Sequence, residues 1–175
     1  TGGAGVVGHY AIQLAKWAGA TVVTTVSSAA KAAHARAAGA DVVISYREEN
    51  VVERIQATLG GIDRVIDVDF GKNLPLTAAV LNPFAAITCY ASMSVREPAF
   101  PYDKLLRLNV SVRPVFVYTM SDTAKAQAQA DIARWVAEAK PIFAIAARFP
   151  LREVVTAHLE VERGEKIGHV LLSID

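Results

Sequence analysis

Short runs of β-branched residues alternate along this chain with longer stretches in which apolar residues recur every three or four positions. The first long stretch, residues 6–18, ends at Gly19 and predicts a helix. The β-branched run at residues 21–26 predicts a buried parallel strand. The same reasoning predicts helices at residues 29–38, 51–59 and 123–139, and strands at residues 41–44, 64–68, 84–90 and 110–118. Such alternation with short glycine turns is typical of a doubly wound parallel α/β sheet.

The regular alternation ends near residue 140. Apolar segments at residues 142–149 and 168–174 flank a predicted helix at residues 151–162. We therefore divide the chain into a domain at residues 1–140 and a second part at residues 141–175. The second part is either a separate small unit or the returning end of a domain that begins upstream. In the helix at residues 123–139 the predicted apolar side holds Ile132, Trp135 and Val136.

Composition narrows the functional classes. Hydrophobic residues make up 53% of the chain, but no apolar run approaches the roughly 18 residues of a membrane span. The net charge of +1 gives no reason to expect a nucleic acid or an anionic membrane as partner. Cys89 is the only cysteine, which excludes an internal disulfide and a cysteine-rich zinc site within this chain. We expect a reducing, cytoplasmic location.

The first predicted helix follows a glycine loop. Gly3, Gly5 and Gly8 have the G-x-G-x-x-G spacing of a dinucleotide-binding loop, with Val6 and Val7 between the last two. The first glycine permits a tight turn, the second lets backbone N–H groups approach a pyrophosphate, and the third lets the helix pack closely. A strand normally feeds such a loop, so we expect a further strand upstream and interpret the chain as a piece of a longer protein.

The end of the second strand indicates which dinucleotide is bound. A carboxylate about 20 residues after the loop usually holds a free ribose 2′-hydroxyl. Here Ser27 and Ser28 occupy that place, and Lys31 follows one turn later. Hydroxyls and an ammonium suit a 2′-phosphate, so the sequence favours NADP over NAD. The alternative is that the two serines only cap a helix and that Lys31 is solvated, and both interpretations can hold together.

Two other nucleotide-binding classes fit poorly. Short-chain dehydrogenases need a tyrosine four residues before a lysine on one helix, and none of the five tyrosines has that spacing. A methyltransferase would need an acidic residue at the end of the second strand, where this chain has serines.

Several segments in order resemble one family. The loop at residues 3–8, the segment at 37–46 (AAGADVVISY), the strand at 61–67 (GIDRVID) and the ending at 157–171 resemble the medium-chain dehydrogenase/reductase superfamily. Within it they are similar to the zinc-independent, zeta-crystallin-like quinone oxidoreductases. Val6 replaces a glycine that is usual in the family loop, which leaves slightly less room beside a pyrophosphate.

The resemblance implies a Rossmann-type cofactor domain that binds NADPH, and a C-terminal segment that returns to a GroES-like catalytic domain absent from this chain. The loop would hold the pyrophosphate, Ser27 and Lys31 the 2′-phosphate, and Tyr46 the adenine end. Val68 and Asp69, residues 89–91 and residues 116–118 would line the nicotinamide side, and Arg163 or Lys166 would reach the cofactor. The cofactor-binding residues we predict are Gly3, Gly5, Val6, Val7, Gly8, Ser27, Ser28, Lys31, Tyr46, Val68, Tyr90, Phe116 and Val117. The resemblance further implies a homodimer formed through the last strand, at residues 110–118.

Candidate catalytic side chains are few. We expect Cys89 to be a buried structural thiol, His9 to contact solvent or the cofactor edge, and Asp67 to form hydrogen bonds at a strand end. The other histidines are scattered along the sequence without metal-ligand spacing, so we expect no zinc site in this chain.

The absence of acid–base groups suits direct hydride transfer, in which the cofactor carries the chemistry. The expected function is hydride transfer from NADPH to a quinone or enone, without appreciable turnover by this chain alone because half of the substrate cleft lies outside it. The alternatives are a zinc-dependent alcohol dehydrogenase, an enoyl reductase module of a fatty acid or polyketide synthase, and an NADPH sensor without turnover.

Overall fold

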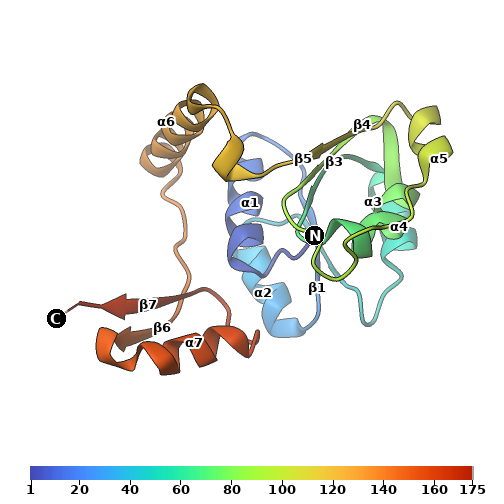
Figure 1. The fold of residues 1–175 in the computed structure, drawn as a ribbon. Coiled ribbons are helices and arrows are strands. Elements are labelled where there is room, and N and C mark those ends of the chain that lie inside the picture. The colour runs from blue at the N-terminus through green and yellow to red at the C-terminus, as the bar shows by residue number, and fades with distance from the viewer. Residues whose placement is uncertain (175) are drawn as a thin grey trace.

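The computed structural model describes residues 1–174, in which parallel strands are flanked by helices (Figure 1). The elements of the first part are α1 (Val6–Trp17), β1 (Val23–Val26), α2 (Ala29–Ala37), β2 (Val42–Ser45), α3 (Val51–Leu59), β3 (Ile62–Asp67), α4 (Phe70–Val80), β4 (Leu81–Cys89), α5 (Tyr102–Arg107), β5 (Ser111–Pro114), η1 (Val117–Thr119) and α6 (Asp122–Ala139). The remaining elements are β6 (Ile145–Pro150), η2 (Leu151–Glu153), α7 (Val154–Glu162) and β7 (His169–Ser173).

Every pairing between strands in the described residues is parallel. β1 pairs with β2, and β4 lies between β3 and β5. The register aligns Val26 with Ser45, Asp67 with Cys89, and Cys89 with Pro114. The carboxyl ends of the strands in each sheet therefore lie at the same edge, which is the arrangement that doubly wound α/β folds use for ligand binding. The predicted parallel α/β fold class is confirmed.

Three apolar clusters hold the helices on the strands. One joins α1, α2 and β1 and includes Ile12, Val26 and Ala35. The second joins α4, β4 and α5, and the third joins α3 to β2. Because each crossover helix covers the strands that it connects, burial of these clusters fixes the strand order.

A cavity of about 540 Å³ lies between β1 and β3. Within residues 1–174 no backbone hydrogen bonds join these two strands, so each has one unpaired edge that faces the cavity. Ile66, the next-to-last residue of β3, is 44% exposed as a result. The sheet thus consists of two halves, with helix α1 beside the opening.

The C-terminal segment forms its own two-stranded parallel sheet from β6 and β7, covered by α7. An extended connection after α6 leads to it, and Figure 1 shows it as a separate unit beside α2. This observation fits the change of pattern seen in the sequence near residue 140.

The structure departs from the predicted elements at several positions. Helices α4 and α5 were not predicted, and α4 contains Pro75, a residue that usually ends a helix. The strand predicted at residues 110–118 is shorter in the structure, because β5 ends at Pro114 and residues 117–119 form a 3₁₀ turn. On α6 only Trp135 is buried, whereas Ile132 and Val136 are exposed, so the predicted apolar side was wrong for these two.

Phe84 provides a test of the backbone conformation. Its φ is 61°, in the left-handed region that disfavours side chains with a Cβ, and its ring is 72% exposed. Left-handed backbone costs about 1–2 kcal/mol for a non-glycine residue, partly offset by the extra freedom of glycine in the unfolded chain. We predict that Phe84→Gly raises the free energy of unfolding by about 0.5–1 kcal/mol in urea denaturation. Phe84→Ala, which removes the ring but keeps Cβ, is the control, and an equal gain in this variant would contradict the explanation.

Candidate functional site

The glycine loop is packed tightly between α1 and β1. Gly2 has a φ of 64°, and Gly5 N donates to Gly2 O at 3.0 Å, which closes a turn directly before α1. A Cβ on Gly8 would lie 2.2 Å from Gly2 O, and one on Gly3 would lie 2.0 Å from Thr24 Oγ1. Glycine is therefore needed at these two positions because the helix and the strand approach the loop so closely.

The amino end of α1 is uncapped. Its N-cap residue is Gly5, which has no side chain, and the first turn contains no acidic residue. The backbone hydrogen bonds of α1 begin with His9 N, which donates to Gly5 O. The N–H groups of Val6, Val7 and Gly8 lie before this bond and therefore have no carbonyl partner within the helix. Side chains cap α2, α3 and α6, whereas α4, α5 and α7 also have no side-chain cap. Free N–H groups and the helix dipole make this end of α1 suited to an anion.

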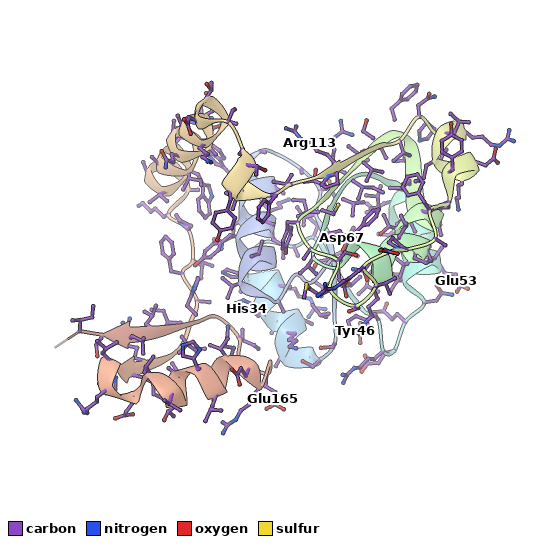
Figure 2. The ribbon with its side chains drawn as sticks, viewed as in Figure 1. His34, Tyr46, Glu53, Asp67, Arg113 and Glu165 are labelled. Atoms are coloured by element: carbon purple, nitrogen blue, oxygen red, sulfur yellow. The ribbon has the colours of Figure 1, made fainter. Side chains whose placement is uncertain are left out.

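The residues predicted to select a 2′-phosphate lie after β1 and β2. Tyr46 N donates to Val26 O at 3.1 Å, which holds Tyr46 beside the end of β1 where Ser27 follows. Ser28 Oγ accepts from Lys31 N at 3.4 Å and caps α2, so its capping role is confirmed. Within residues 1–174, neither the Ser27 hydroxyl nor the Lys31 ammonium has a hydrogen-bond or ion-pair partner. Figure 2 labels Tyr46, which is 54% exposed.

The residues predicted for the other end of a dinucleotide follow β3, β4 and β5. Tyr90 N donates to Asp67 O and Val115 N donates to Cys89 O, so the three strand ends stay adjacent. Val68, Tyr90, Phe116 and Val117 are all partly or largely exposed there. The rings of Phe116 and Tyr118 contact each other at 5.1 Å between centroids. The result is an apolar surface at the carboxyl edge of the second half of the sheet.

Asp67 forms the hydrogen bonds at a strand end that the sequence predicted. It is fully buried, and its Oδ1 accepts from Thr1 Oγ1, Asp69 N and Asn73 Nδ2 at 2.8–2.9 Å. Oδ2 has no partner among the described residues. The position of Asp67 joins the glycine loop to β3 and the start of α4.

The neighbours of Asp67 are poor nucleophiles. Burial raises the pKa of the Cys89 thiol, and the Asp67 carboxylate raises it further. The same two causes raise the pKa of Tyr90. These shifts agree with the expectation that Cys89 is a structural thiol. The pKa of Asp69 is lowered because Ser94 donates hydrogen bonds to it, which fixes the loop after β4.

The histidines are arranged differently from the expectation. His9 does not contact solvent: it is 2% exposed and hydrogen-bonds Ile142 O at 3.0 Å. It stacks on His34, and its neighbour Tyr10 bonds His169 at 2.7 Å. These histidines are far apart in the sequence but lie together in the fold. The contacts join α1 to the C-terminal unit, and no local pattern in the sequence could have revealed them.

Neither a metal cluster nor a membrane span is present in residues 1–174. No group of three or more histidine, cysteine or acidic side chains is placed to hold a metal ion there. None of the helices in this range is both long and apolar enough to cross a bilayer.

Comparison with known proteins places the chain in a family. The sequence profile described as zinc-binding dehydrogenase matches residues 6–134. The chain belongs to this family. Over 71 residues it is 49% identical to a quinone oxidoreductase of Salmonella typhimurium, covering 40% of this chain and 22% of that protein. Over 175 residues it is 29% identical to a 2-haloacrylate reductase of Burkholderia sp, covering 97% of this chain and 53% of that protein.

Solved structures show the same fold. The Escherichia coli quinone oxidoreductase complexed with NADPH superposes with a TM-score of 0.81 at 27% identity, covering 98% of this chain and 55% of that one. Mycobacterial Rv1454c complexed with NADPH gives a TM-score of 0.83 at 26% identity, again covering 98% and 55%. The chain therefore spans about half the length of these relatives. The resemblance to dehydrogenases and quinone oxidoreductases inferred from the motifs is confirmed.

Substitution of Gly8 tests the close packing of the glycine loop. Gly8→Ala places a Cβ against the backbone of Gly2 and Gly3, so we predict a loss of about 1–3 kcal/mol in the free energy of unfolding. Gly5→Ala is the matched control, because its Cβ would meet Gly2 O at an ordinary 3.4 Å and its φ is −73°. Urea denaturation of both variants measures the difference. Equal stability of the two variants would show that the close contact at Gly8 is unimportant.

Proposed function

We propose that this chain is the cofactor-binding part of an NADPH-dependent oxidoreductase that reduces a quinone or an enone. The observation that carries the proposal is the uncapped amino end of α1 at the carboxyl edge of parallel strands, with polar groups on one side and an apolar surface on the other. A pyrophosphate would take the N–H groups of residues 6–8, which have no side-chain cap to compete with it.

The adenosine end would lie over β1 and β2. Ser27 and Lys31 would bind the 2′-phosphate, and the aromatic ring of Tyr46 would stack on the adenine or contact that phosphate. The support comes from two polar groups without partners in residues 1–174 and from the absence of an acidic residue directly after β1. A carboxylate at Ser27 would instead favour a free 2′-hydroxyl and repel the phosphate.

The nicotinamide end would lie over β3, β4 and β5. Val68, Tyr90, Phe116 and Val117 would pack on the ring and keep water from the reacting face. When bound, NADPH supplies the hydride, so this chain would contribute position and a dry surface rather than an acid or a base. The names of the quinone oxidoreductases and the NADPH complexes among its relatives support this assignment. The motif resemblance favours a reaction without zinc.

A second candidate activity is that of a zinc-dependent dehydrogenase. The description of the matching family, zinc-binding dehydrogenase, favours it, and the same cofactor domain would serve both reactions. In that case the metal ligands would belong to a part of the protein outside these 175 residues.

We further propose that residues 141–175 belong to a catalytic domain, and that a dimer in the cytoplasm forms through β5. The separate β6–β7 sheet supports the first point. The second rests on the unpaired outer edge of β5, although Arg113 and Pro114 leave little of that edge apolar. Arg113 is labelled in Figure 2.

Discrimination between the two nicotinamide cofactors tests the proposed function. We predict that Lys31→Ala weakens NADPH binding about 10-fold or more but changes NADH binding less than about twofold, since a charged hydrogen bond contributes about 1.5–3 kcal/mol. Lys31→Glu should weaken NADPH binding further. Fluorescence titration with each cofactor gives the dissociation constants.

Lys104→Ala removes an exposed lysine from α5, away from this edge, and is the control for a general loss of positive charge. An equal loss of NADPH and NADH binding in Lys31→Ala, or no binding of either cofactor by the unaltered protein, would contradict the proposal.

The cavity between β1 and β3 has the position of a missing strand. We propose that a further parallel strand fills it, because both bordering edges are unpaired and Thr1 N already donates to Ile66 O at 2.9 Å on β3.

In a longer form of the protein that carries an upstream segment, we predict that the amides of β1 and β3 exchange with solvent as slowly as those of β4. Hydrogen exchange measured by mass spectrometry tests this, and fast exchange confined to β1 and β3 in the longer form would contradict it.

A further inference from the structure

Helix α1 forms three hydrogen bonds to Ile142, in the connection between α6 and β6. Ile142 N donates to Gln13 Oε1 at 2.8 Å, and Ile142 O accepts from Gln13 Nε2 at 3.1 Å. The same carbonyl lies 3.0 Å from His9 Nε2. Because a carbonyl oxygen only accepts, Nε2 of His9 carries the proton and Nδ1 has the free lone pair. Both side chains are buried, whereas Ile142 is 49% exposed, so the bonds are shielded from water only on the side of α1.

A second set of contacts ties α1 to β7. Tyr10 Oη and His169 Nε2 are 2.7 Å apart, and the Tyr10 ring lies edge-on to Trp135, which is 4% exposed. The backbone before β7 is equally close-packed: a Cβ on Gly168 would lie 2.6 Å from Ala144 O. The C-terminal unit is therefore attached to the first part of the chain through one face of α1. We call the contacts of His9, Tyr10 and Gln13 with Ile142 and His169 the α1 junction.

A pair of stacked histidines lies inside this junction. The rings of His9 and His34 are 4.2 Å apart between centroids and nearly parallel, at 14°. Nδ1 of His9 and Nε2 of His34 are buried and have no hydrogen-bond partner among the described residues. A proton added to Nδ1 would create a buried donor without an acceptor, next to a second imidazole. The geometry therefore favours two neutral rings.

The surroundings offer no negative charge to a protonated pair. The titratable groups here are His9 and Tyr10 on α1, His34 on α2, and His169 on β7. Lys166, on the turn before β7, adds a positive charge and donates to Gly168 O at 3.1 Å. Glu165, labelled in Figure 2 on the same turn, forms no ion pair with any of these rings within residues 1–174. Burial, and then His9, lower the pKa of His34.

We propose that the α1 junction, together with the His34 ring that stacks on His9, is a pH-sensitive latch: protonation of His34 loosens the hold of α1 and α2 on the unit formed by β6, η2, α7 and β7. A proton on the buried Nε2 of His34 would find no acceptor, and the charge would lie at stacking distance from the His9 ring. The open state exposes the rings to water and to protons, so acidification favours it over the closed state.

The direction with pH follows from the lowered pKa of His34. An exposed histidine titrates near pH 6.5, whereas the closed junction takes up this proton only at lower pH. The closed state is therefore fully favoured above about pH 6.5 and loses stability as the pH falls from there through the pKa of the closed form. This inference does not depend on which cofactor or substrate the protein binds.

Hydrogen exchange at two pH values tests the latch. After correction for intrinsic exchange rates, we expect the amides of residues 142–144 and 168–173 to lose about 10-fold or more of their protection between pH 7.5 and 5.5. The amides of β4, which lie outside the junction, should keep theirs. Loss of protection in β4 to the same extent would mean global unfolding and would overturn the proposal.

His34→Phe keeps a flat ring against His9 but cannot be protonated, so its junction should lose less than about threefold in protection. His34→Gln is a second variant that retains a polar side chain and should behave alike. His158→Gln removes an exposed histidine of α7 outside the junction and should respond to pH as the unaltered protein does. A pH response of equal size in all variants, or none in the unaltered protein, would overturn the proposal.

Discussion

The close approach of Gly8 to the backbone of Gly2 and Gly3 is the constraint on which the rest of the molecule depends. It lets α1 start directly at the loop, with Gly5 as a cap that has no side chain. The N–H groups of the first turn are consequently left for an external anion. On its other faces the same helix carries the apolar cluster with α2 and β1, and the contacts to the C-terminal unit. One helix thus positions both the candidate binding edge and the second part of the chain.

The candidate site extends beyond the glycine loop because the strands of each half are parallel. Because the strands in each half run in the same direction, residues that follow them gather at the carboxyl edge of that half. The glycine loop lies next to both halves, since Gly3 is close to Thr24 of β1 and Gly2 is close to Val68 after β3. Polar groups follow the first two strands and apolar side chains follow the other three. NADPH has a matching distribution, with a negatively charged 2′-phosphate on the adenosine ribose at one end and an uncharged nicotinamide ring at the other. This correspondence, rather than any single residue, supports the proposed function.

The sequence predicted those elements whose limits are set by local chemistry. Helix α3 was predicted with its observed limits because Asn50 caps its first turn and Gly60 adopts a left-handed conformation after it. Helix α4 was missed because Pro75 lies inside it, and the length of β5 was overestimated because the chain turns after Pro114. The roles predicted for Ser27, Lys31 and Tyr46 stay predictions. The burial of His9 could not be predicted, since its partner Ile142 is 133 residues away.

Backbone NMR of the ¹⁵N-labelled protein titrated with NADPH measures the central claim most directly. If the pyrophosphate binds at the uncapped end of α1, the amide resonances of Val6, Val7 and Gly8 should shift most, and they should saturate together with those of Ser27 and Lys31. If NADPH saturates the protein while the amides of Val6 to Gly8 keep their positions, the pyrophosphate binds elsewhere and the amino end of α1 is not its site.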